Sequence, residues 1–198
     1  MLFRSRDMTA VDDLAYLYMD LLDTLDLRDV TLVGVQLGGW IALEMAVKST
    51  QRLSKLVLAN SVGVKHGDRE CRDIADIYAV TDKTLAGLVY ADPARMAVDT
   101  KTLPESELVA MARSRESTGR YAWSPYMHNP KLKGRLHRIK IPTLALWGAD
   151  DRVVTADYGR GLAAAISGAR FESIEAAGQF AHLEQPDAFA RAAGAFAG

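Results

Sequence analysis

A glycine-rich turn near the start of the chain holds the residue whose type matters most for chemistry. The apolar run Val30–Val33 predicts a buried strand, and the run Trp40–Val47 predicts a helix. Between them, the turn Gly34-Val35-Gln36-Leu37-Gly38-Gly39 would present one side chain at its tip, in a strained backbone that requires small neighbours. That side chain belongs to Gln36. Since a base cannot activate an amide as an acyl-transfer nucleophile, the turn offers the frame for catalysis without its reacting atom.

Two later segments carry side chains that can exchange a proton. The first has two neighbouring carboxylates after a predicted strand, and the second has one histidine after a glycine. Their residues are Ile141–Trp147 with Gly148, Asp150 and Asp151, and Gly178–Pro186 with Gln179 and His182. Carboxylate and imidazole groups are the usual partners of a nucleophile, so both segments are candidates for a site shared with the turn.

In this order, the three segments resemble the α/β-hydrolase superfamily, in particular the cap-bearing serine hydrolases of esters and of carbon–carbon bonds. The resemblance covers nearly the whole chain, but only the later part of the family fold. It implies an α/β protein with a three-layer α/β/α parallel sheet, built from the C-terminal strands only, and an inserted helical cap. The alternation of predicted strands and helices independently favours a parallel sheet with right-handed crossovers.

The resemblance also assigns positions to a Ser-His-Asp triad. The nucleophile position is Gln36, and the histidine position, directly after the glycine of the last segment, is Gln179. The acid usually lies three residues after the glycine that ends its strand, which selects Asp151 over Asp150. The backbone N–H of Leu37 would lie in the oxyanion hole. The elbow glycines would be Gly34, Gly38 and Gly39.

Structural roles compete with these assignments. Asp151 could be a loop carboxylate or helix N-cap. His182 lies three residues beyond the histidine position, which moves an imidazole out of hydrogen-bond reach, so we favour packing beside Phe180 and Leu183. Within the resemblance, many relatives carry a second histidine there without catalytic duty. The alternative is that His182 or Asp151 acts as the base of an enzyme with a non-serine mechanism.

The chain divides into three predicted parts. Residues 6–61 form the first part of the core, residues 62–138 the helical cap, and residues 139–198 the second part of the core. The cap is more charged than its flanks, with predicted helix starts at Asp68, Asp82 and Ser106. The expected strands, in spatial order, are Val30–Val33, Leu53–Ala59, Ile141–Trp147 and Ala169–Ile174. The first would then be an apolar edge through which the chain could self-associate.

The N-terminus carries a separate expectation. Leu2-Phe3-Arg4-Ser5 is what the end of a common sequencing adapter would encode, so residues 1–5 are interpreted as an artefact and excluded from fold reasoning. An amphipathic helix at residues 12–25 precedes the turn. In the family the first half of the sheet comes before this helix, and the sequence shows none of it, which indicates a gene fragment.

Composition excludes several function classes. The net charge of −1 gives no electrostatic case for nucleic acid. No apolar run reaches the ~18 residues that span a membrane, so a cytoplasmic protein is expected. The single Cys71 excludes an internal disulfide, and on a predicted charged helix it is interpreted as a bystander. The four histidines show no metal-ligand spacing, and we expect no metal and no cofactor.

Three functions remain open. The first is a catalytically inactive pseudoenzyme or gene fragment whose ancestors hydrolysed an ester or a carbon–carbon bond. The others are an active enzyme of non-serine mechanism, and a module that binds a small ligand or a partner. In the first case the Gln179 side-chain amide should donate to Asp151, with Gln36 nearby or bonded to Gln179, because buried amides need partners.

Overall fold

A computed structural model describes residues 8–68, 70–96 and 98–198 of the 198-residue chain. Residues 1–5, interpreted above as an artefact, lie outside the described residues. The elements follow in the order α1 (Val11–Thr24), β1 (Val30–Val35), α2 (Leu37–Lys48), β2 (Leu53–Ala59), α3 (Asp82–Val89), α4 (Pro93–Met96), η1 (Thr100–Thr102), α5 (Glu105–Ala122), η2 (Lys133–Arg138), β3 (Thr143–Gly148), α6 (Ala156–Ala164), β4 (Arg170–Ile174), α7 (Ala181–Glu184) and α8 (Pro186–Ala197).

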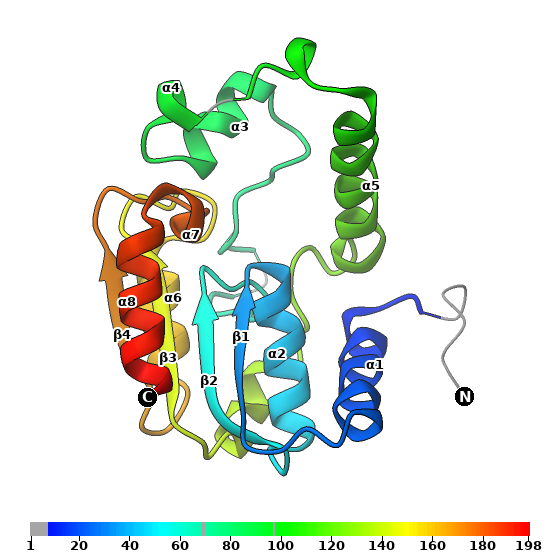
Figure 1. Ribbon diagram of the computed structural model, residues 1–198, viewed down its shortest axis with the longest axis vertical. Helices are drawn as coiled ribbons and strands as arrows, with labels where there is room; N and C mark the ends of the chain where they lie inside the picture. Colours follow the sequence, from blue (N-terminus) through cyan, green and yellow to red (C-terminus); the bar gives the residue numbers. More distant parts are fainter. Residues whose placement is uncertain (1–7, 69, 97) are drawn as a thin grey trace.

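The described residues form one sheet of four parallel strands in the order β1-β2-β3-β4, which confirms the predicted spatial order. These strands are short apolar runs, and a run buried on both faces is typical of a parallel sheet covered by helices. Figure 1 shows α2 and α6 on one face of the sheet and α8 on the other. Alternate residues of β2 separate the two layers: Leu56 and Leu58 pack with the α2 and α6 side, and Val57 packs with the α8 side.

Strand β1 forms one edge of this sheet. Val33 pairs in register with Val57, so both side chains lie on the α8 face. Val57 is fully buried, whereas Val33 is 46% exposed, because α8 packs beside β3 rather than β1. The predicted apolar edge is therefore present in the part of the chain that the structure describes.

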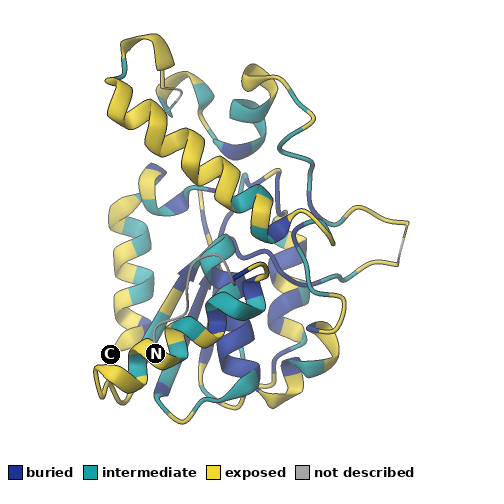
Figure 2. Ribbon diagram, turned by 90° about the vertical axis from the view of Figure 1, so that its right-hand side faces the viewer, coloured by how far each residue is buried: buried dark blue, intermediate teal, exposed yellow. Residues whose placement is uncertain are grey.

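The segment between β2 and β3 contains α3, α4, η1, α5 and η2; α3, α4 and α5 lie beyond one end of the sheet (Figure 1), whereas η2 packs against α2. Helix α5 is exposed along most of its length (Figure 2). Predicted starts at Asp82 and Ser106 agree with α3 and α5 within one residue.

The helix predicted to start at Asp68 is wrong, and Cys71 is therefore not on a helix. Instead, aspartate side chains accept hydrogen bonds from the backbone N–H groups of this segment. Asp68 accepts hydrogen bonds from the N–H groups of Glu70 and Cys71, both at 2.9 Å. Asp73 accepts from two further backbone N–H groups of the same loop. Side chains that bond the backbone locally compete with a helical ladder, which explains the irregular loop.

Candidate functional site

The turn between β1 and α2 has the geometry that its glycines predict. Gln36 lies at the tip with φ 53° and ψ −115°, a conformation that L-residues rarely adopt. A Cβ atom on Gly34 would lie 2.5 Å from the backbone oxygen of Gly38, and one on Gly39 would lie 2.4 Å from Oγ of Ser61. Since a backbone oxygen cannot move aside, Gly34 has to be glycine for strand and helix to approach this closely.

The side chain of Gln36 makes a contact with the predicted histidine segment. Its Nε2 donates to the backbone oxygen of Gln179 at 3.2 Å. Leu37 is the first residue of α2, and no hydrogen bond recorded for the described residues uses its N–H as donor. The first N–H groups of a helix lack partners within that helix, so this amide needs an acceptor that does not come from α2.

Asp151, three residues after the end of β3, is 3% exposed. Its Oδ1 accepts from the N–H groups of Val153 and Val154 at 2.8 and 2.9 Å. Its Oδ2 accepts from Nδ2 of Asn60 at 2.7 Å. Burial raises the pKa of Asp151 to about 6, because these hydrogen bonds only partly offset the cost of removing the charge from water.

Asn60 is a site residue that the sequence analysis missed. It follows β2 with φ 45°, and its Nδ2 also approaches the oxygen of Gly178 at 3.4 Å. The expected hydrogen bond from the Gln179 side chain to Asp151 is not among those of the described residues, and Asn60 supplies the amide donor instead. The signal was its position, since β2 lies next to β3 and side chains at the carboxyl ends of adjacent parallel strands meet.

Glu184 is a second residue that the sequence analysis missed. Its hydrogen bonds link the loop around Gln179 to the segment between β2 and β3. The carboxylate is 6% exposed, and its oxygens accept from the N–H of Gly178 at 2.6 Å and of Ala91 at 2.8 Å. The N–H of Gln179 donates to the oxygen of Val89 at 2.8 Å. A buried carboxylate without a cation is stabilised by such backbone donors, so Glu184 fixes the residues after α3 over the loop.

The three positions implied by the resemblance thus lie at one end of the sheet. Gln36 contacts Gln179 directly, and Asn60 connects Asp151 to Gly178. His182, on α7, packs with ring centroids 6.2 Å from Phe180 and 5.9 Å from Phe189, and burial lowers its pKa.

The chemistry available at this end of the sheet is limited by the side chains present. Ser61 lies beside the turn, but it is fully buried and its Oγ donates to the oxygen of Val62 at 2.9 Å. Among the described residues, no group of three or more His, Cys, Asp or Glu side chains could hold a metal ion. Within the described ranges, every helix is too short or too polar to span a lipid bilayer.

Comparison with known proteins places these features in a family. The Alpha/beta hydrolase family matches residues 3–192. A 2-hydroxy-6-oxononadienedioate/2-hydroxy-6-oxononatrienedioate hydrolase of Paraburkholderia xenovorans is 30% identical over 188 residues, 86% of this chain and 63% of its own length. A 2-hydroxy-6-oxo-6-phenylhexa-2,4-dienoate hydrolase of Comamonas testosteroni is 28% identical over 183 residues, 87% of this chain and 64% of its own. The chain therefore spans less than two thirds of either relative.

Solved structures agree on the fold. A serine hydrolase involved in carbazole degradation superposes with a TM-score of 0.71 at 20% identity, covering 95% of this chain and 71% of its own. A bromoperoxidase from Bacillus anthracis superposes with a TM-score of 0.70 at 18% identity, covering 95% and 74%.

Proposed function

Because the chain belongs to the α/β-hydrolase family, we propose that it is a member without serine-hydrolase activity, a pseudoenzyme that retains the frame of a hydrolytic site. The segment of residues 62–138 would be its cap. The ancestral reaction would be hydrolysis of a carbon–carbon bond, as the names of the relatives suggest, or of an ester. The observation that carries this proposal is the carboxamide of Gln36 at the tip of the strained turn.

The contacts of Gln36 support the loss of nucleophilic chemistry. In a serine hydrolase the tip side chain gives its proton to a histidine, which an acid orients. Here the tip amide donates to a backbone oxygen of Gln179, and both oxygens of Asp151 are occupied by other donors. No proton path links the three positions through an imidazole, because both the nucleophile and histidine positions carry glutamine.

A non-serine enzyme is the alternative that one observation favours. A carboxylate with a pKa of about 6 is near the value that suits a general base at neutral pH. Against this role, Asp151 is buried and its oxygens already accept three hydrogen bonds.

Steady-state turnover separates these functions. The substrates are 2-hydroxy-6-oxo-6-phenylhexa-2,4-dienoate and a panel of p-nitrophenyl esters, compared between the chain, Gln36→Ala and Asp151→Asn. We expect the chain to match buffer and Gln36→Ala. Turnover that Gln36→Ala removes would overturn the proposal. Turnover that survives Gln36→Ala but disappears in Asp151→Asn would establish the non-serine enzyme instead.

A further inference from the structure

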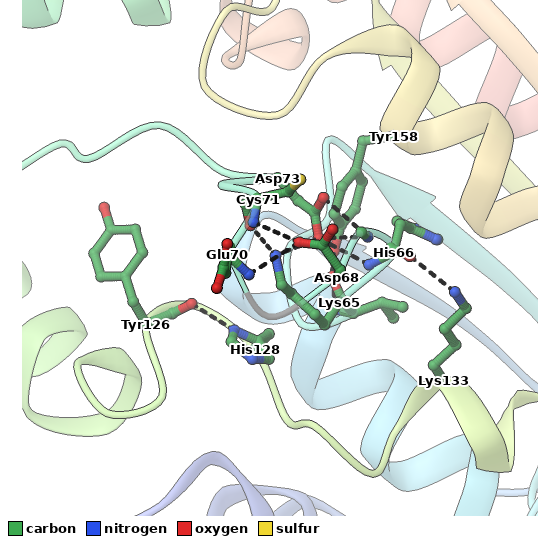
Figure 3. A network of polar contacts seen from close by, with 12 residues as sticks. Lys65, His66, Asp68, Glu70, Cys71, Asp73, Tyr126, His128, Lys133 and Tyr158 are labelled. Carbon is green, nitrogen blue, oxygen red and sulfur yellow. Dashed lines mark hydrogen bonds and ion pairs between the residues drawn. The ribbon is translucent and has the colours of Figure 1, made fainter.

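A cavity lies apart from Gln36 and the residues that contact it. It has a volume of about 450 Å³ and opens between the loop after β2 and the segment after α5. Its lining residues are Val64, Lys65, Glu70, Cys71, Arg72, Asp73, Ile74, Asp76, Trp123, Tyr126 and His128. Figure 3 shows this loop facing Tyr126 and His128. The volume lies in the range of small-molecule sites, and no lining residue occupies a triad position.

Two aromatic rings form one wall of this cavity. Trp123 and Tyr126 meet edge to face with centroids 6.2 Å apart, and Tyr78 supports Trp123 at 5.6 Å. Trp123 nevertheless remains 58% exposed, which is unusual for a large aromatic side chain. The Tyr126 hydroxyl accepts from the Ile77 N–H at 2.9 Å and donates to the Ala75 oxygen at 3.0 Å. Tyr126 therefore offers a ligand its ring and not its hydroxyl.

Most charged groups of the cavity are already paired. Asp73 accepts from Nζ of Lys65 at 3.1 Å and from two backbone N–H groups, and Lys65 also donates to the Cys71 oxygen. Asp76 accepts from two backbone N–H groups and faces Arg72 at 3.6 Å. These four side chains stabilise the loop and neutralise one another, so they add little net charge for a ligand.

Two hydrogen-bond acceptors of the cavity, the Glu70 carboxylate and Nε2 of His128, have no partner among the residues that the structure describes. Nδ1 of His128 lies 2.8 Å from the Tyr126 oxygen, and since a carbonyl only accepts, Nδ1 carries a proton; when the ring holds that single proton, Nε2 is an acceptor. Glu70 lies on the side of the loop that faces Tyr126 and His128 (Figure 3). Within residues 8–68, 70–96 and 98–198, no recorded hydrogen bond or ion pair involves the Glu70 carboxylate or the His128 Nε2.

We propose that this cavity binds an organic cation, a primary ammonium group carried on an aromatic or other apolar body. An ammonium has three donors and no acceptor, which complements the Glu70 carboxylate and the His128 Nε2. The rings of Trp123 and Tyr126 attract a cation through their π faces and cover the apolar body. This site is independent of the proposed loss of hydrolysis, since it shares no residue with the Gln36 end of the sheet.

The test compares three probes of nearly the same shape: 2-phenylethylammonium, neutral 2-phenylethanol and anionic 3-phenylpropanoate. Binding is followed by calorimetry and by the change in tryptophan fluorescence. We expect this change to come from Trp123, because Trp40 and Trp147 are buried and do not line the cavity. We expect the ammonium to bind about tenfold more tightly than the alcohol, the value of one charge-assisted hydrogen bond at a partly exposed site. Equal binding of the alcohol, tighter binding of the carboxylate, or no binding of the ammonium would overturn the proposal.

Variants locate the site. Glu70→Gln should lose about tenfold in affinity for the ammonium while leaving binding of the alcohol unchanged. Glu105→Gln, at the start of α5 outside the cavity, is the matched control and should bind like the unmodified chain. Gln36→Ala should also bind normally. If Glu70→Gln keeps full affinity, or if Gln36→Ala loses it, the ammonium binds elsewhere and the assignment is wrong.

Discussion

Burial and hydrogen bonding shift the pKa of the Asp151 carboxyl group in opposite directions. Burial is the larger effect and raises its pKa from the ordinary 3.8 to about 6. At a pH between these two values, the folded protein therefore holds a proton on Asp151 that the unfolded chain has released. The stabilisation from this proton is fully present below pH 3.8 and is lost as the pH rises through about 6. The difference is worth about 3 kcal/mol.

We therefore expect the free energy of unfolding to fall by up to about 3 kcal/mol as the pH rises from near 4 to above 6. Asp151→Asn should flatten this dependence, because the amide does not titrate. Asp150→Asn removes the neighbouring, partly exposed carboxylate and should leave the dependence intact. Chemical denaturation at several pH values checks all three proteins. Identical pH profiles for Asp151→Asn and the unmodified chain would rule out a buried, protonated Asp151.

Contacts between individual side chains were also the features that could be predicted least well from the sequence. Position in the chain and the family resemblance selected Gln36, Asp151 and Gln179, which do lie near one another. The partner of Asp151 is Asn60, which directly follows β2, so identifying it requires the pairing of β2 with β3 in addition to position in the chain. Likewise, the bonds of Glu184 to Gly178 and Ala91 depend on how two distant segments pack, which leaves no periodic signal in the sequence.

At the scale of elements, the turn between β1 and α2 depends on close backbone contact rather than on a side chain. A methyl group at Gly34 would meet the backbone of Gly38 and Gly39 at 2.5 to 2.8 Å. At Gly38, in the first turn of α2, a methyl group would meet nothing within 4 Å. Two glycines of one motif thus have different physical roles.

We predict that Gly34→Ala destabilises the protein by about 3 kcal/mol or more, since overpacking here cannot be relieved by a side-chain rotation. Gly38→Ala should be neutral or stabilising by about 0.5–1 kcal/mol, because alanine has the better helix propensity. Thermal and urea unfolding of the two variants provide the comparison. An equal loss in both, or a tolerated Gly34→Ala, would contradict the close approach of β1 and α2.

Elements were predictable where the hydrophobic pattern alone determines them. Leu53–Ala59 agrees with β2 residue for residue, and the other strands agree within two residues of their predicted ends, since each is an apolar run that must be buried. The loop around Asp68 was not predictable in this way. Its aspartates favour helix starts in sequence, yet here they cap turns of a loop whose path is set by pairing of Lys65 with Asp73.

For the whole molecule, the exposed side of β1 is the main structural anomaly. Strands of a parallel sheet are usually covered on both faces and paired on both edges, unless they lie at a protected edge. Val33, on the α8 face of this strand, is 46% exposed. We propose that the chain self-associates through this edge.

Sedimentation velocity over the micromolar range tests this association. The chain should sediment increasingly as an oligomer as its concentration rises, and Val33→Lys should shift it towards monomer, because a charge on an edge strand opposes pairing. Val109→Lys, on exposed α5, is the matched control and should associate like the unmodified chain. A strictly monomeric chain with a cooperative unfolding transition would show that the β1 edge is stable without a partner.

The absence of a serine nucleophile is tested most directly by intact-mass spectrometry after incubation with a fluorophosphonate, which forms a covalent adduct with activated serines. With glutamine at the tip of the turn and at the histidine position, we predict no gain in mass beyond that of the heat-unfolded chain. Removing members of a triad costs several orders of magnitude in rate, so no slow labelling should emerge over hours. A stoichiometric adduct mapped to a serine beside the turn, such as Ser61, would contradict the proposed loss of serine chemistry.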